Sequence, residues 1–83
     1  MMTLNKSEQG KKYRIRCVDG SDHRWFSPSF RKYIIPGNIL EVISKHYDTI
    51  TIRVNNSRTF CFANSVCEWI MIDSYANNLI SVE

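Results

Sequence analysis

Hydrophobic and polar residues alternate along several short segments of this chain, which is typical of strands whose sheet is buried on one face. In residues 12–18 one predicted face carries Tyr13, Ile15 and Cys17, and the other face carries lysine and arginine. Residues 49–55 repeat the period with isoleucine and valine alternating with threonine, arginine and asparagine. These two segments predict half-buried strands.

Three further strands are predicted from the same kind of pattern. Residues 38–46 follow the turn signal Pro36-Gly37, because proline fixes its own φ and glycine tolerates positive φ. Residues 47–49 connect this strand to the next one as a hairpin. The asparagines at 55 and 56 favour a second tight turn before a strand at 58–63. One helical turn through residues 66–68 and a short strand at 69–72 complete the pattern.

A short helix is predicted between the first two of these strands. Asp19 to Asp22 form a dense turn signal. After it, Ser27 is a suitable N-cap and Pro28 a suitable first helical residue, so we expect a helix over residues 28–33. Pro36 disfavours helical geometry in the residue before it and stops the helix.

The order of elements favours a mainly β fold, a small SH3-like β-barrel of about five strands with a short helical insert between the first two strands. Bending lets so few strands enclose a core and hides most strand edges. A helix packed on a sheet, an α+β domain, is the alternative. We expect residues 1–83 to form a single domain, with 1–10 a loosely held arm that Leu4 anchors and 74–83 a C-terminal tail.

The composition of the chain bears on where in the cell the protein is located. The chain has 83 residues, 43% of them hydrophobic, and a formal charge of +3. No stretch reaches the roughly 18 apolar residues that span a bilayer, and the N-terminus lacks the apolar block of a secretory signal. Three cysteines form neither a disulfide framework nor a zinc-binding spacing. These features predict a cytoplasmic location.

Catalytic and metal-binding signals are weak. No nucleophile is placed beside a base and no paired carboxylates stand out, so the sequence does not predict an enzyme. His23 and His46 lie in predicted loops without ligand spacing, and no resident cofactor or metal is expected. Transient binding of ferrous iron or another transition metal by these histidines remains a weaker hypothesis.

The region around the helical insert is the candidate contact surface. Large aromatic residues and basic residues gather there outside the regular strands, and such residues commonly anchor protein interfaces. Some of the aromatics are also needed to close one end of the barrel. The predicted partner-binding residues are Trp25, Phe26, Phe30, Arg31, Lys32 and Tyr33.

A small β-barrel that binds nucleic acid is the alternative function. It is suggested by the mild basic excess and by basic residues interleaved with aromatics in strand 12–18. However, Tyr13 is predicted to face the core while Arg14 and Arg16 face solvent, which divides the patch across the sheet. We therefore expect no nucleic-acid partner.

The chain resembles the FeoA family, ferrous iron transport protein A. The resemblance covers about residues 3–73 and is carried by an ordered set of segments rather than by one motif. Lys32-Tyr33 stands where the family usually has Leu-Gly, and the loop at residues 45–48 is shorter than in the family. The segments are Thr3-Leu4 with Gly10, Ile34 to Gly37 followed by Leu40 to Val42, Ile50 to Val54, Phe60 to Phe62, and Asn64 to Ile72.

This resemblance implies an SH3-like fold and an accessory role in bacterial ferrous iron uptake. Proteins of this family look like cytosolic partners of the membrane ferrous iron transporter, protein B of the same system, which carries a GTP-binding domain. We therefore expect a non-catalytic protein that binds or regulates that transporter through protein contacts at the inner face of the membrane. Self-association is a further expectation that the sequence leaves open.

Overall fold

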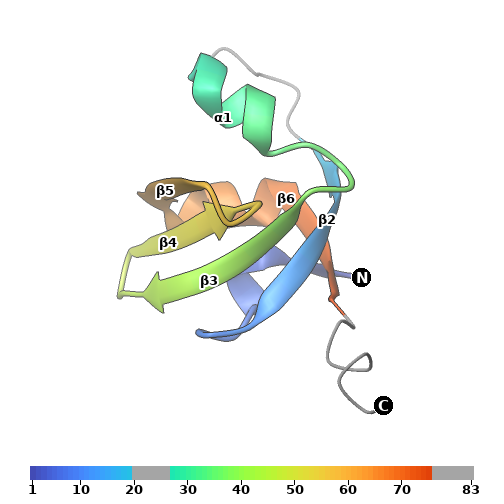
Figure 1. The fold of residues 1–83 in the computed structure, drawn as a ribbon. Coiled ribbons are helices and arrows are strands. Elements are labelled where there is room, and N and C mark those ends of the chain that lie inside the picture. Colours follow the sequence, from blue (N-terminus) through green and yellow to red (C-terminus); the bar gives the residue numbers. More distant parts are fainter. Residues whose placement is uncertain (20–26, 76–83) are drawn as a thin grey trace.

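The computed structural model describes residues 1–19 and 27–75. Six strands and one α-helix make up most of this part of the chain (Figure 1). In chain order the elements are β1 (Met2–Thr3), the 3-10 helix η1 (Leu4–Lys6), β2 (Lys12–Val18), α1 (Pro28–Tyr33), β3 (Ile39–Lys45), β4 (Thr49–Val54), β5 (Arg58–Ala63), the 3-10 helix η3 (Asn64–Trp69) and β6 (Ile70–Ser74).

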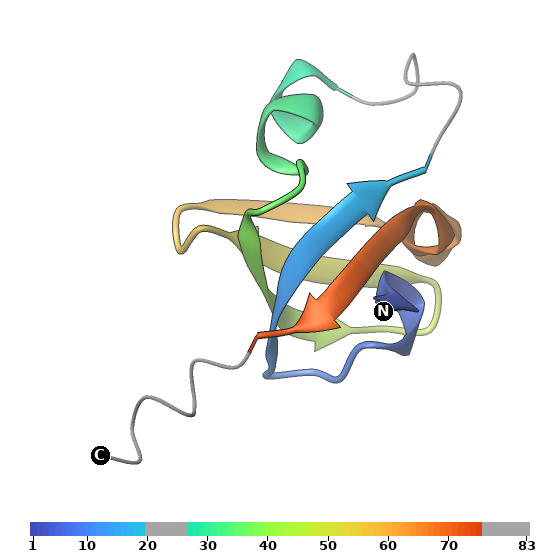
Figure 2. The same ribbon diagram turned by 90° about the vertical axis from the view of Figure 1, so that its right-hand side faces the viewer.

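The strands form one antiparallel sheet in the order β1-β6-β2-β3-β4-β5. It is strongly bent, so that β5 and η3 come round toward β6, as Figures 1 and 2 show together. The predicted mainly β, SH3-like class is confirmed. The sheet has six strands rather than about five, because the predicted N-terminal arm adds β1 at the edge beside β6.

The N-terminal segment is held more firmly than the sequence suggests. Met2 and Thr3 pair with β6, and Leu4 is fully buried. The Lys45 ammonium donates hydrogen bonds to the main-chain oxygens of Asn5 (3.1 Å) and Ser7 (2.6 Å). Leu4 anchors this segment as predicted, and backbone pairing with β6 holds it more firmly than the loose arm expected for residues 1–10.

A β-bulge in β2 changes which side chains face the core. Tyr13 and Ile15 are buried as predicted, but the register with β6 shifts between Ile15 and Cys17. An extra residue in one strand reverses the facing of those that follow it. Cys17 is consequently exposed, and its predicted place on the buried face is wrong.

The core lies inside the bend of the sheet and consists of regularly spaced aliphatic side chains. Every second residue of β4 is fully buried, and β3 and β6 contribute in the same way, as their alternation predicts. The aliphatic side chains with no exposed surface are Leu4, Ile15, Leu40, Val42, Ile50, Ile52, Val54, Ile70 and Ile72.

The two tight turns next to β3 and β4 use the residues that the sequence indicates. Gly37 has φ 97°, and its N–H donates to the Ile15 oxygen at 2.8 Å, so the Pro36-Gly37 turn is tied to β2. Asn55 and Asn56 have φ values of 52° and 61°, a conformation that asparagine tolerates better than most residues. Both turns agree with the prediction.

Helix α1 has the predicted bounds. The Ser27 hydroxyl accepts a hydrogen bond from the Phe30 N–H at 3.1 Å, and Pro28 opens the helix. The helix stops without a glycine, because the Asn38 side chain donates to the Tyr33 oxygen at 2.7 Å. The sequence predicts that Pro36 ends the helix. The Asn38 side chain adds a hydrogen-bond donor for the Tyr33 carbonyl, which has no partner within the helix. Helix α1 stands above one end of the sheet (Figures 1 and 2).

Candidate partner-binding site

Helix α1 is joined to the sheet by a cluster of aromatic rings. The Phe30 ring meets Phe60 and Phe62 of β5 edge-on, with ring centroids 5.8 and 5.4 Å apart. Tyr33 tilts against Phe60 at 6.0 Å. Edge-to-face rings at these distances attract one another beyond the effect of their burial. The cluster fixes where α1 sits and so positions the predicted contact residues.

The predicted contact residues divide into buried and exposed ones. Phe30 is 7% exposed and serves mainly to pack the helix, while Tyr33 is half-buried. Arg31 and Lys32 are exposed in the last turn of α1, and the Lys32 ammonium lies 5.9 Å from the Tyr33 ring centre. Trp25 and Phe26, also predicted, fall outside the described residues.

Two apolar grooves border α1, one on each side of Phe30. The first, here called the aromatic groove, has a volume of about 460 Å³ and is lined by Ser27, Phe30, Phe60, Cys61, Phe62, Val66 and Trp69. The second has about 390 Å³ and is lined by Cys17, Val18, Phe30, Arg31, Ile34, Ile35 and Pro36. Both sizes are in the range of ligand-binding clefts, and both linings are mainly hydrophobic.

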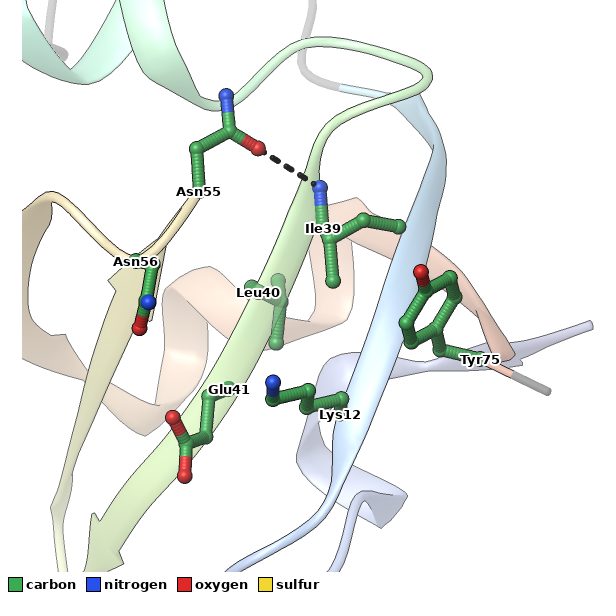
Figure 3. A pocket seen from close by; sticks show the side chains of 7 residues that line it. All are labelled: Lys12, Ile39, Leu40, Glu41, Asn55, Asn56 and Tyr75. Carbon is green, nitrogen blue, oxygen red and sulfur yellow. Dashed lines mark hydrogen bonds between the residues drawn. The ribbon is translucent and has the colours of Figure 1, made fainter. Parts of the chain in front are cut away.

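A third, smaller pocket of about 200 Å³ lies on the outer face of the sheet (Figure 3). Lys12 extends between Glu41 and Tyr75, and the Asn55 side chain accepts a hydrogen bond from the Ile39 N–H at 3.1 Å. Because Asn55 holds the backbone here, its amide is already used structurally. No serine, cysteine or histidine is among the described residues that line this pocket.

The basic residues of β2 do not form a continuous patch. Arg16 pairs with Asp73 at 3.1 Å, and the Arg14 guanidinium lies 5.8 Å from the centre of the Tyr75 ring. Tyr13 is 4% exposed, and its hydroxyl accepts a hydrogen bond from the Glu8 N–H at 2.8 Å. The aromatic and basic groups of this strand thus lie on opposite sides of the sheet, as predicted.

The three thiols and the His46 imidazole belong to different parts of the fold, with Cys17 in β2, Cys61 in β5 and Cys67 in η3. Within residues 1–19 and 27–75 no three of the His, Cys, Asp and Glu side chains gather as metal ligands do. Cys17 and Cys61 are exposed. Cys67 is buried, and desolvation raises the pKa of its thiol to about 11, opposed by the nearby Lys45 charge. His23 lies outside the described residues, and the His46 imidazole lies 3.5 Å from the Ser44 hydroxyl.

Within the described residues, no helix has the length and apolar character needed to cross a membrane.

Comparison with known proteins identifies the fold and the family. A family model described as "FeoA domain" matches residues 2–74, which is most of the chain. The chain belongs to the FeoA family. No curated protein sequence matches it.

Solved structures agree with this FeoA assignment in fold. Zinc-complexed FeoA from Stenotrophomonas maltophilia, described as an SH3 domain protein, superposes with a TM-score of 0.72 at 14% identity, covering 88% of this chain and 91% of that one. FeoA from Chlorobium tepidum gives 0.70 at 18% identity, covering 92% of this chain and 72% of that one. A manganese-dependent transcriptional repressor in complex with manganese gives 0.77 at 14% identity, covering 89% of this chain but only 36% of that one.

The aromatic groove of this FeoA domain is the feature that sequence reasoning missed. Its walls come from α1, β5 and η3, which are separated in the chain and meet only in the folded structure. Phe60 and Phe62 are predicted from the sequence as an alternating pair and Val66 as part of a helical turn, whereas Trp69 was predicted to start the last strand and instead ends η3. These side chains meet Phe30 only in the tertiary structure, so no local sequence pattern predicts the groove.

Proposed function

We propose that this FeoA-family protein is an accessory component of bacterial ferrous iron uptake that binds and regulates the membrane ferrous iron transporter, protein B of the same system, through protein contacts. The observation that carries the proposal is the FeoA match over residues 2–74. It is supported by the S. maltophilia relative, which is described as a candidate activating factor for bacterial ferrous iron transport. Such a role places the chain in the cytoplasm, at the inner face of the membrane.

The proposal invokes binding rather than catalysis. The described residues offer grooves lined by aromatic and aliphatic side chains, and they lack a cluster of ligands or paired titratable groups around them. Aromatic side chains with arginine at their margin are the residue types that contribute most to protein interfaces. The surface around α1 therefore fits an accessory protein that contacts a larger partner.

The test is co-purification of this chain with the transporter's cytosolic domain. We expect the double variant Arg31→Glu, Lys32→Glu to weaken capture by at least about tenfold, since reversing two rim charges disfavours a complementary surface. Both side chains are exposed, so the fold should survive. Lys6→Glu, an exposed charge reversal in η1, is the matched control and should leave capture unchanged.

A readout in cells complements the capture experiment. Deleting this chain should lower ferrous iron uptake by cells that depend on the transporter, and the Lys6→Glu variant should restore uptake while the double variant does not. If the chain is not captured by the transporter domain and its deletion leaves ferrous uptake intact, the proposed function is wrong.

A further inference from the structure

Strand β5 has an unpaired edge. It is the last strand in the sheet order and pairs with β4 from Thr49↔Ala63 to Val54↔Arg58. Among the described residues, no strand other than β4 pairs with β5. A strand with one free edge presents a row of N–H and C=O groups that a further strand can use.

The aromatic groove runs along this edge. Three successive residues of β5, namely Phe60, Cys61 and Phe62, line it. Phe60 and Phe62 both face Phe30, and Cys61 between them also lines the groove, so the groove follows β5 over three residues. Val66 and Trp69 of η3 extend the apolar lining beyond the end of β5.

A cationic side chain, Arg58, lies at one end of this edge. Arg58 is the first residue of β5. Its guanidinium donates a hydrogen bond to the Ser29 hydroxyl at 3.3 Å and lies 5.9 Å from the Phe60 ring centre. Arg31 and Lys32 lie in the last turn of α1, and Arg31 lines the second groove rather than the aromatic groove. In the part of the chain that the structure describes, none of these three forms an ion pair with a carboxylate. Glu68, an exposed acidic residue of η3, lies beyond the far end of the strand.

From these observations we infer that β5 receives an extended segment of a partner protein as an additional strand. The segment alternates apolar with other side chains, so that its apolar residues enter the aromatic groove. It also carries aspartate or glutamate toward the Arg58 end. Main-chain hydrogen bonds supply affinity in this binding mode, and the pockets for alternate side chains supply specificity. The identification of the partner protein as the transporter rests on the proposed function.

Charge favours a different protein over a second copy of this chain. Strand β5 contains Arg58 and no acidic residue, so β5 of another copy does not supply the carboxylates that the cationic end requires. Self-association through β5 is therefore an outcome that the experiment must exclude.

The test selects peptides and then locates where they bind. A display library of short random peptides is selected on the intact chain, and the enriched peptides are synthesised. We expect alternating apolar peptides rich in Asp and Glu, which shift the backbone amide resonances of residues 58–63 and protect those amides from hydrogen exchange. Methylating alternate peptide nitrogens removes donors from the added strand, and we expect this to weaken binding by about tenfold or more.

Two protein variants separate the edge from the rest of the sheet. Cys61→Lys places a charge in the groove and should abolish peptide binding. Its matched control is Thr51→Lys, because Thr51 is the cross-strand neighbour of Cys61 but lies in β4, which is paired on both sides. Arg58→Glu should weaken binding of the acidic peptides, and Lys6→Glu should not.

The inference is overturned if no peptide is enriched, if enriched peptides shift amides elsewhere, or if Cys61→Lys and Thr51→Lys behave alike. If the chain dimerises as its concentration rises, and Cys61→Lys prevents this, the β5 edge binds a second copy of the chain. That result would also overturn the inference. Failure of the proposed function can be told apart from failure of this inference. In that case peptides bind at β5, but the transporter domain is not captured. Capture of the transporter by Cys61→Lys at the level of the unaltered chain refutes only the added strand.

Discussion

The sheet and helix α1 are held in place by different kinds of contact. Within the sheet, backbone ladders join every strand to its neighbour, and most of the aliphatic side chains of the core are fully buried. Helix α1 has six residues and depends on a cap at each end, the Phe30 ring and the Tyr33 ring. A helix this short is not stable alone, so its tertiary packing sustains it.

This difference separates a part that fixes the fold from a part that presents a surface. Loss of a core side chain should weaken the whole domain, because the strands share one core. Loss of a contact under α1 should release the helix while the sheet stays paired, because local openings need much less free energy than global unfolding. The grooves border the element that is held by fewer contacts.

The largest expected effect is in the core of the sheet. Ile52→Ala removes a fully buried side chain from β4 and should lower the free energy of unfolding by about 3 kcal/mol, since it loses apolar burial and leaves a cavity. Urea unfolding measures this change. Ile35→Ala, at a position that is 42% exposed, is the control and should cost much less. Equal losses for the two variants would remove the distinction between core and surface.

Phe30→Ala tests how α1 is attached. We expect a loss of about 2 kcal/mol, below that of a fully enclosed phenylalanine, because the grooves on both sides admit water to the vacated space. Hydrogen exchange followed by NMR should show the α1 amides losing protection while the β4 amides keep theirs. Uniform loss of protection across α1 and β4 would show that the helix and sheet unfold as one unit.

Cys67 should make the sheet sensitive to alkali. Burial raises the pKa of its thiol to about 11 from an ordinary value of 9.0, so between these two pH values the unfolded chain releases the proton and the folded chain keeps it. Stability contributed by this group is complete below pH 9 and is lost as pH rises toward 11, by up to about 2 kcal/mol. Denaturation of the unaltered chain and Cys67→Ala at several pH values measures the difference.

The control for this effect is the exposed pair of thiols. Cys17 and Cys61 should react with an alkylating reagent in the folded protein, whereas Cys67 should react only after unfolding. A steady stability difference between the unaltered chain and Cys67→Ala from pH 8 to 11 would contradict the pKa assignment.

The smallest effect is expected at the start of α1. Ser27→Ala removes the side-chain acceptor for the Phe30 N–H and should cost about 1 kcal/mol of helix stability. Ser27→Asn, which restores an N-cap acceptor, should recover most of the loss. Amide exchange in α1 reports both. If Ser27→Ala leaves exchange unchanged, the aromatic cluster alone holds the helix.

Local patterns predicted most of the fold. The bounds of α1, the β4 alternation and the Asn55-Asn56 turn follow from capping, period and backbone preference, which act within a few residues. The β2 bulge escaped prediction because it depends on pairing with β6, some 55 residues away along the chain. Strand β1 was missed because a two-residue strand has no period to detect.

The candidate site was predicted less completely than the fold. Residues around the insert were recognised by type, and the structure shows Arg31 and Lys32 exposed beside two grooves. Phe30 proved mainly structural because β5 supplies two rings against it. The free edge of β5 was not foreseen, since closure of the barrel was expected to hide most edges. Strand order depends on the pairing of the whole sheet, so it cannot be predicted from the sequence of any one segment.

The position of β6 has a consequence for how the chain is synthesised. This last strand lies between β1 and β2, the first two, and pairs with both. Strands β3, β4 and β5 pair with sequence neighbours and can form hairpins while the ribosome is still extending the chain. Strand β2 can pair with β3 early, but β1 must wait for Ile70–Ser74 to emerge, because β6 is its neighbour in the sheet. Pairing across such a sequence distance slows folding, so the nascent chain carries Met2–Thr3 unpaired until β6 has been synthesised.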